Sequence, residues 1–144
     1  GYAALLHDVE KIGVHEDILN NTDKLTDEEY KAIQRHPEIS AEIIAPVPFL
    51  NPSVNAVRHH HERWDGRGYP DGLSGEQIPL MARIISVVDA FDAMTSDRSY
   101  RSALSHEVAL QKIQSGKGEQ FDPRIADLFD HHKDEILVRE EVTP

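Results

Sequence analysis

The sequence predicts an all-α fold. Apolar residues recur at helical spacing along nearly the whole chain, and capping residues and prolines separate the apolar stretches. No stretch alternates apolar with polar residues as a half-buried strand would. The chain has 144 residues, of which 39% are hydrophobic and 28% charged, so it can bury a core of its own. Because it has no repeat, low-complexity tract or interdomain linker, residues 1–144 are expected to form one domain.

The first three predicted helices are marked by their ends. The stretch YAALLHDVEKI has helical spacing but begins without a capping residue. Thr26 can cap the next helix, and Glu29 three residues later completes a capping box. Pro37 interrupts that helix and opens another, PEISAEIIAPV, at a first-turn position where its missing N–H costs nothing.

The middle of the chain carries a helix, a turn-rich segment and a long helix. Asn51 and Pro52 begin the helix PSVNAVRHHHERW, predicted over 52–64, which ends in a Gly-, Pro- and Asp-rich segment at 65–79. Residues 79–97 form the longest predicted helix. Because this helix is strongly apolar, it is expected at the centre of the fold.

Two more helices are predicted in the C-terminal part. The first begins near Ser105, and Gly116 and Gly118 then interrupt the chain. The stretch DPRIADLFDHHKDEIL closes the fold as the last helix.

Composition excludes several classes of function. The chain has no cysteine, which rules out disulfides and zinc–thiolate sites and fits a reducing cytoplasm, the expected location. Its net charge of −11 argues against a general nucleic-acid-binding surface, although a locally positive site could still bind a small anion. No apolar run approaches the ~20 residues of a membrane span, so no membrane insertion is expected.

Histidines and aspartates on separate helical segments are candidate metal ligands. The chain has nine histidines, and an acidic chain without cysteine suggests a site built from imidazole and carboxylate groups. Asp89 interrupts the apolar helix, where an unpaired buried carboxylate would cost several kcal/mol, so a metal ion or a cationic side chain should meet it. The candidate ligands are His7, Asp8, His36, His60, His61 and Asp89.

Each candidate also has a simpler interpretation. The pairs His7-Asp8 and His60-His61 could be solvated helix ends, and His36 could be favoured at a helix C-terminus by the helix dipole. What favours a metal site is the chemistry of adjacent imidazole and carboxylate groups, since a carboxylate can bridge two ions about 3.5–4 Å apart. These donors suit Fe, Mn, Ni or Zn without choosing between them.

Four stretches of the sequence resemble one family. They are LLHDVEKIG, RHPEISAEII, HHERWDGRGYPDGLSGEQIP and ARIISVVDAFDAMTSDRSYR, and they are similar to the HD-GYP branch of the HD superfamily of phosphohydrolases. The motif HHE-x-x-DG-x-GYP, from His60 to Pro70, has all of its defined residues at their fixed spacing, and His59 lies outside it. The resemblance covers Gly1 to about Asp122.

The resemblance implies a fold and a reaction. It implies an HD-superfamily helical bundle with a metal site in its core. The implied activity is hydrolysis of cyclic di-GMP to linear pGpG, with a further step to GMP left open. The implied centre holds two or three divalent ions, with Fe or Mn first and Zn, Ni or Mg as alternatives. The candidate ligands named above match the family's ligand positions, with Asp8 as the bridging carboxylate.

The resemblance also implies substrate contacts. Lys11 matches the lysine of the HD-x-G-K motif, and Tyr69 of the GYP turn matches a residue that borders the substrate. Arg98 and Arg101 match the arginines of D-R-x-Y-R, and guanidinium groups suit phosphate oxygens. The turn after the histidines is then expected to be a rigid lip over the metal site. Asp92, one turn after Asp89, is predicted either to orient Lys11 or a ligand histidine in catalysis or to be a structural hydrogen-bond acceptor.

Two departures from the family pattern leave a second function open. Position 10 is Glu where the family has Gly. The family also has a further helix upstream of the HD motif, and this helix is expected to be absent from the sequence, because the HD motif begins here at His7. The alternative is therefore a catalytically weak HD-GYP module that binds a nucleotide or a partner protein. Fusion to a sensor or receiver domain is expected from the family, and a homodimer is compatible with it. The remaining histidines are predicted to lie on the surface: His15, His59, His106, His131 and His132.

Overall fold

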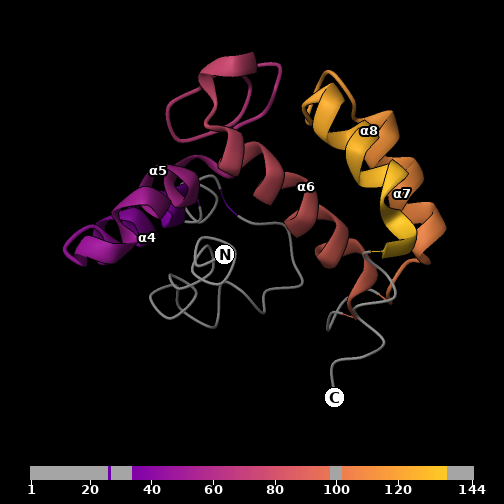
Figure 1. Cartoon of the computed structure of the whole chain (residues 1–144), viewed down its shortest axis with the longest axis horizontal. Helices are drawn as coiled ribbons and strands as arrows, with labels where there is room; N and C mark the ends of the chain where they lie inside the picture. Colours follow the sequence, from indigo (N-terminus) through magenta and orange to yellow (C-terminus); the bar gives the residue numbers. More distant parts are fainter. Residues whose placement is uncertain (1–25, 27–33, 98–101, 136–144) are drawn as a thin grey trace.

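The described part of the chain is helical. The computed structural model describes residues 26, 34–97 and 102–135. It contains the helices α4 (His36–Ile44), α5 (Asn51–His59), α6 (Leu80–Thr95), α7 (His106–Ser115) and α8 (Pro123–His131), with 3₁₀ turns η2 (Pro48–Leu50) and η3 (Gly75–Gln77). No strand occurs within these residues, so the all-α prediction is confirmed (Figure 1). None of the described helices is both long and apolar enough to span a membrane.

Helices α4 and α5 pack side by side and are joined through η2 (Figure 1). Pro37 lies in the first turn of α4, as predicted, because the N–H that proline lacks has no partner within the helix there. Ile44, Leu50 and Val57 are buried together between these elements. Full burial of each such side chain contributes about 1.5–3 kcal/mol to the free energy of folding. These contacts hold α4 against α5.

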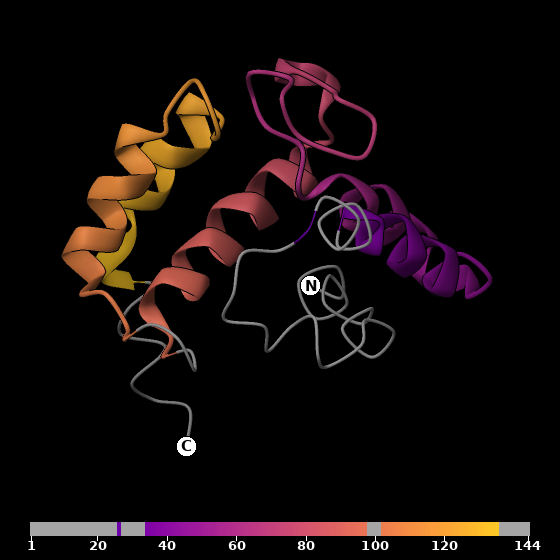
Figure 2. The ribbon, with the colours of Figure 1, turned by 180° about the vertical axis from the view of Figure 1, so that it is seen from behind.

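Helix α6 is central, as its apolar sequence predicts. The pair α4–α5 lies to one side of it and the pair α7–α8 to the other, in both views (Figures 1 and 2). Ala56 and Ile85 pack together between α5 and α6. On the other side, the largest buried cluster joins α6 to α7, α8 and the loop between them; its buried residues are Val87, Phe91, Ala109, Leu110, Ile113, Phe121, Ala126 and Phe129.

Polar side chains start the last two helices. Ser105 precedes α7 and its hydroxyl accepts a hydrogen bond from the Val108 N–H, as expected of an N-cap. Asp122 caps α8 through the Arg124 N–H and also forms an ion pair with Arg83 of α6, at 2.6 Å. The Asp122 side chain is only 1% exposed, so this pair joins α8 to α6 inside the protein.

Helix α5 is shorter than predicted. The sequence predicts a helix through Trp64, but α5 ends at His59. The Trp64 and Asp65 N–H groups donate to the carbonyl oxygens of Gln120 and Glu119, at 3.2 and 2.8 Å. Because these N–H groups bond to a distant loop, they are not available to continue the helix.

Candidate metal centre

Three of the predicted ligands converge. His36 begins α4, while His60 and His61 directly follow α5. The ring centroids lie 4.1 Å apart for His60–His61, 4.6 Å for His36–His61 and 5.8 Å for His36–His60. One nitrogen of each ring lies within 4.8 Å of the corresponding nitrogens of the other two. Helix packing thus brings together residues that are 24 or more positions apart in the sequence, from 36 to 60.

A backbone contact selects the donor nitrogen of His60. Its Nδ1 lies 2.6 Å from the Val57 carbonyl oxygen, so Nδ1 carries the hydrogen and donates it. In the neutral ring the lone pair is then on Nε2. Metal-bound histidines commonly use their second ring nitrogen in this way, which fixes both the tautomer and the ring orientation.

The histidine group fits a divalent metal ion. Metal–nitrogen bonds of about 2.1 Å place neighbouring donors about 3–4 Å apart, and the three donors here require little closure to reach that spacing. His60 is 1% exposed and His36 is 9% exposed, so both rings are largely shielded from water, where a polar group requires a partner such as a bound ion. Imidazole donors suit Zn, Fe, Ni or Cu, and adding carboxylates extends the range to Mn.

Tyr69 lies against the histidine group. Its ring stacks on His61 with centroids 5.1 Å apart and planes 23° apart, and it meets His36 edge-on at 6.3 Å. The turn-rich segment therefore lies next to the histidines, where the sequence predicts a lip.

Close backbone packing holds this segment in place. A Cβ on Gly68 would lie 2.4 Å from the Arg63 nitrogen, 2.5 Å from the Glu62 Cα and 2.6 Å from the His61 oxygen, so only glycine fits. The Tyr69 N–H donates to the His61 carbonyl at 3.4 Å, and the Asp71 N–H donates to Glu62 Oε1 at 2.7 Å. The segment thus runs directly along the residues that follow α5.

The prediction that His59 lies on the surface is wrong. His59 is 9% exposed, and its Nδ1 lies 2.8 Å from the Asn55 carbonyl oxygen. Its Nε2 lies 2.9 Å from Asp71 Oδ2. Both ring nitrogens of His59 therefore lie within hydrogen-bonding distance of an oxygen atom. The turn-rich segment brings Asp71 back against α5, and the helical periodicity around His59 does not indicate the contact between these two residues. His106, His131 and His132 are exposed, as predicted.

His59 belongs to a network that the sequence analysis missed, the Asp71 cluster. Arg58 donates to both oxygens of Asp71, at 3.0 and 2.9 Å, and to Glu38 Oε1 at 3.1 Å. The Arg58 hydrogen bond, followed by that of His59, lowers the pKa of the Asp71 carboxyl to about 2. The members of the cluster are Glu38, Arg58, His59, Glu62 and Asp71. The sequence signal for this network was the pair of opposite charges at positions 58 and 71, which flank the motif on either side.

The Asp71 cluster also contains three groups of metal-binding type. Donor atoms of His59, Glu62 and Asp71 lie within 4.8 Å of one another. However, the Arg58 guanidinium already binds both Asp71 oxygens and supplies the positive charge. A second cation there would be repelled by Arg58, so the His36–His60–His61 group is the better metal site.

The two aspartates of α6 lie in different environments. Asp89 is half-buried and stands outside the group formed by His36, His60 and His61 within the described residues. Asp92 is exposed, and its Oδ1 accepts a hydrogen bond from the Ser96 hydroxyl at 3.4 Å. The orienting role of Asp92 and its structural alternative both remain predictions. The other predicted site residues lie outside the described part of the chain: His7, Asp8, Glu10, Lys11, Arg98 and Arg101.

Comparison with known families identifies the fold. A family model for the HD domain matches residues 1–125 of the chain. The chain belongs to the HD domain family. A crystal structure of a cyclic GMP-AMP-specific phosphodiesterase from Vibrio cholerae is similar to this HD domain, with a TM-score of 0.63 and 27% identity. The match covers 88% of this chain and 28% of that one, and it confirms the predicted HD-superfamily helical fold.

Curated relatives of this HD domain are named as phosphodiesterases. A cyclic di-GMP phosphodiesterase response regulator of Xanthomonas campestris pv. campestris is 43% identical, over 87% of this chain and 34% of the relative. A cyclic di-GMP phosphodiesterase of Vibrio cholerae is 40% identical, over 88% and 27%. A 3'3'-cGAMP-specific phosphodiesterase of the same organism is 34% identical, over 94% and 26%. The HD-GYP resemblance is thus confirmed, and the chain spans about a third or less of these relatives.

Proposed function

We propose that this HD domain is a metal-dependent phosphodiesterase that hydrolyses cyclic di-GMP to linear pGpG, and further to GMP. The observation that carries the proposal is the convergence of His36, His60 and His61, with Tyr69 beside them. Relatives named for hydrolysis of cyclic dinucleotides support the substrate class. The proposed domain extends over residues 1–144.

The histidine group would hold the metal ions together with the remaining predicted ligands His7, Asp8 and Asp89. Two divalent ions, or three, are proposed, with Fe or Mn first. When bound, such ions supply Lewis-acid stabilisation of phosphoryl oxygens and acidify a water molecule for attack on phosphorus. The chain's own contribution is to fix the donor rings, as the Val57 carbonyl does for His60.

The substrate would be held by positive and aromatic groups. Lys11, Arg98 and Arg101 are proposed to bind phosphate oxygens, which provides local positive charge in a chain of net charge −11. Tyr69 is proposed to border the substrate, since its ring packs on His61 at the histidine group. Asp92 is proposed to orient Lys11 or a ligand histidine and not to contact the substrate itself.

Turnover of defined cyclic dinucleotides tests this proposal. The purified protein is prepared anaerobically, loaded with Fe(II) or Mn(II), and incubated with cyclic di-GMP or 3'3'-cGAMP. We expect chromatography to show the linear dinucleotide from cyclic di-GMP, and a His60→Ala variant to lose at least 100-fold in rate. A folded protein that converts neither substrate with any divalent metal would refute the proposal.

Glu10 favours a second function. Where the family has Gly in the HD-x-G-K motif, a carboxylate here would lie beside Lys11 and repel substrate phosphates. The chain would then be a catalytically weak module that binds a nucleotide or a partner protein.

The substitution Glu10→Gly distinguishes these functions. If Glu10 suppresses catalysis, the substitution should raise kcat/KM about tenfold or more, because removing one close like charge is worth on the order of 1–2 kcal/mol. Steady-state kinetics with the same metal loading measure the change. High activity that Glu10→Gly leaves unaltered would rule out the weak-module function. The cytoplasmic location, the sensor or receiver partner and the homodimer remain predictions.

A further inference from the structure

Asp71 follows the Tyr69-Pro70 pair and connects the turn-rich segment to α5 by several bonds. Its two carboxylate oxygens accept from Arg58 Nε at 3.0 Å and Arg58 Nη2 at 2.9 Å. One of them also lies 2.9 Å from His59 Nε2. Its N–H donates to Glu62 Oε1 at 2.7 Å. Asp71 is therefore fixed at both its side chain and its backbone.

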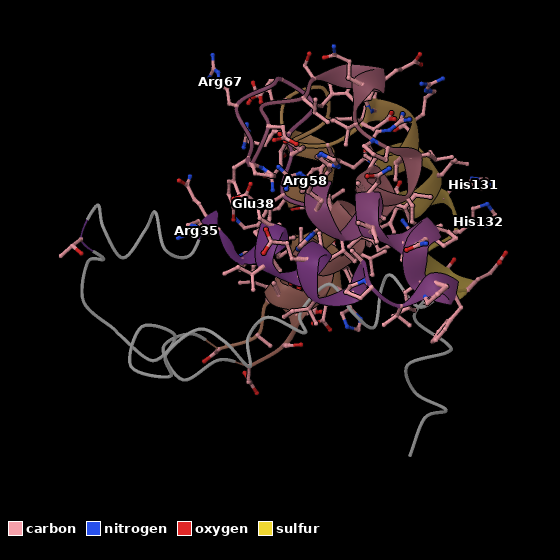
Figure 3. The ribbon with its side chains drawn as sticks, turned by 90° about the vertical axis from the view of Figure 1, so that its left-hand side faces the viewer. Arg35, Glu38, Arg58, Arg67, His131 and His132 are labelled. Carbon is pink, nitrogen blue, oxygen red and sulfur yellow. The ribbon has the colours of Figure 1, made fainter. Side chains whose placement is uncertain are left out.

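The Asp71 cluster reaches every described segment that carries a residue of the histidine group. Arg58 and His59 immediately precede His60 and His61 in the sequence. Through its bond to Glu38 Oε1 at 3.1 Å, Arg58 also joins α4 two residues after His36. Figure 3 shows Arg58 and Glu38 next to each other at the side of the molecule. The cluster thus connects the backbones on either side of the proposed metal site with the segment of Tyr69.

We infer that Asp71 is a positioning residue, whose hydrogen bonds with Arg58 and His59 hold the Tyr69 ring against His61 and so set the substrate-facing wall of the site. This inference rests on the proposed function for its catalytic part. The positioning of Tyr69 itself is a structural claim that can be tested without turnover.

The bonds of the cluster suit positioning better than stabilisation. The side chains of Arg58 and Asp71 are 30% and 40% exposed, and ion pairs at such exposure contribute little to global stability. A guanidinium that donates to both oxygens of a carboxylate nevertheless fixes direction as well as distance. The low pKa of Asp71, about 2, keeps the carboxylate ionised throughout the neutral range.

Asp65 provides a matched control in the same segment. Arg63 donates to both of its oxygens, at 3.1 and 2.7 Å, and its pKa is also lowered to about 2. The hydrogen-bond partners of its side chain, Arg63 and the Arg67 N–H, are only two residues away in the sequence. The Asp65 side chain therefore resembles that of Asp71 in charge and bonding but does not connect the segment to a helix.

Hydrogen exchange tests the structural part. In Asp71→Ala, we expect the amide hydrogens of residues 69 and 71 to exchange at least tenfold faster than in the wild type. The amides of α7 should keep their exchange rates. NMR measures these rates residue by residue. In Asp65→Ala, the Tyr69 amide should stay within twofold of the wild type. Unchanged exchange at both positions in Asp71→Ala would overturn the inference, whatever the activity.

A double-mutant cycle tests the catalytic part. We expect Asp71→Ala to lower kcat/KM for cyclic di-GMP more than tenfold through a higher KM, at unchanged metal content. Because Asp71 acts through Tyr69, the variant Tyr69→Ala/Asp71→Ala should be no less active than Tyr69→Ala. Additive losses, or full activity in Asp71→Ala, would overturn the catalytic part. If the wild type has no turnover, the proposed function fails, and hydrogen exchange still decides whether Asp71 positions Tyr69.

Discussion

At the scale of single residues, Gly68 shows how closely the turn-rich segment packs on the residues after α5. Its φ is not in the left-handed region, so the backbone conformation alone does not require glycine. The requirement comes from the space available, since a Cβ would overlap three backbone atoms of residues 61–63 at 2.4–2.6 Å. Any side chain at position 68 must therefore displace either the turn-rich segment itself or the backbone of residues 61–63.

We therefore expect Gly68→Ala to be destabilising for steric reasons. Overpacking against backbone should lower the free energy of unfolding by about 2–3 kcal/mol. Gly75→Ala is the control, because Gly75 has φ +55° and open space around a Cβ, which leaves only a conformational cost of about 1 kcal/mol. Chemical denaturation of the two variants measures the difference. Equal losses of unfolding free energy in the two variants would show that small movements of the segment relieve the steric overlap at position 68.

At the scale of elements, sequence reasoning succeeded where a local signal exists. Pro37 lies in the first turn of α4 and Ser105 caps α7, as predicted, because proline and serine act on the first turn of their own helix. The end of α5 was missed, because Trp64 and Asp65 bond to carbonyl groups some 55 residues later in the sequence. Helical periodicity contains no information about such a partner.

The same distinction applies to the candidate site. The family motifs indicated His36, His60 and His61 as ligands, while their convergence depends on how α4 packs against α5 through Ile44 and Val57. The burial of His59 could not be predicted, because its partner Asp71 arrives by way of a turn whose path is set by Gly68. Motif residues can thus be found from their types, whereas the residues that position them follow from the packed structure.

At the scale of the whole molecule, the histidine group draws its members from two parts of the fold, which packing and the Arg58–Glu38 ion pair hold together. His36 belongs to α4, and His60 and His61 lie where the chain leaves α5 toward the segment before α6. An ion bound by all three would bind the folded chain and not the unfolded one, because only folding brings the donors together. Metal binding should therefore add to the free energy of unfolding.

We expect a rise in Tm when a divalent metal is added. At a free metal concentration of 100 times Kd, the gain is about 2.7 kcal/mol, which corresponds to roughly 5–10 °C for a domain of this size. Differential scanning calorimetry with Mn(II), Fe(II) or Zn(II) measures it. The variant His60→Ala should lose most of the shift, whereas His132→Ala, which removes an exposed histidine of α8's C-terminal end, should retain it. Equal shifts in both variants would mean that metal binds elsewhere, and the His36–His60–His61 group would no longer be the candidate centre.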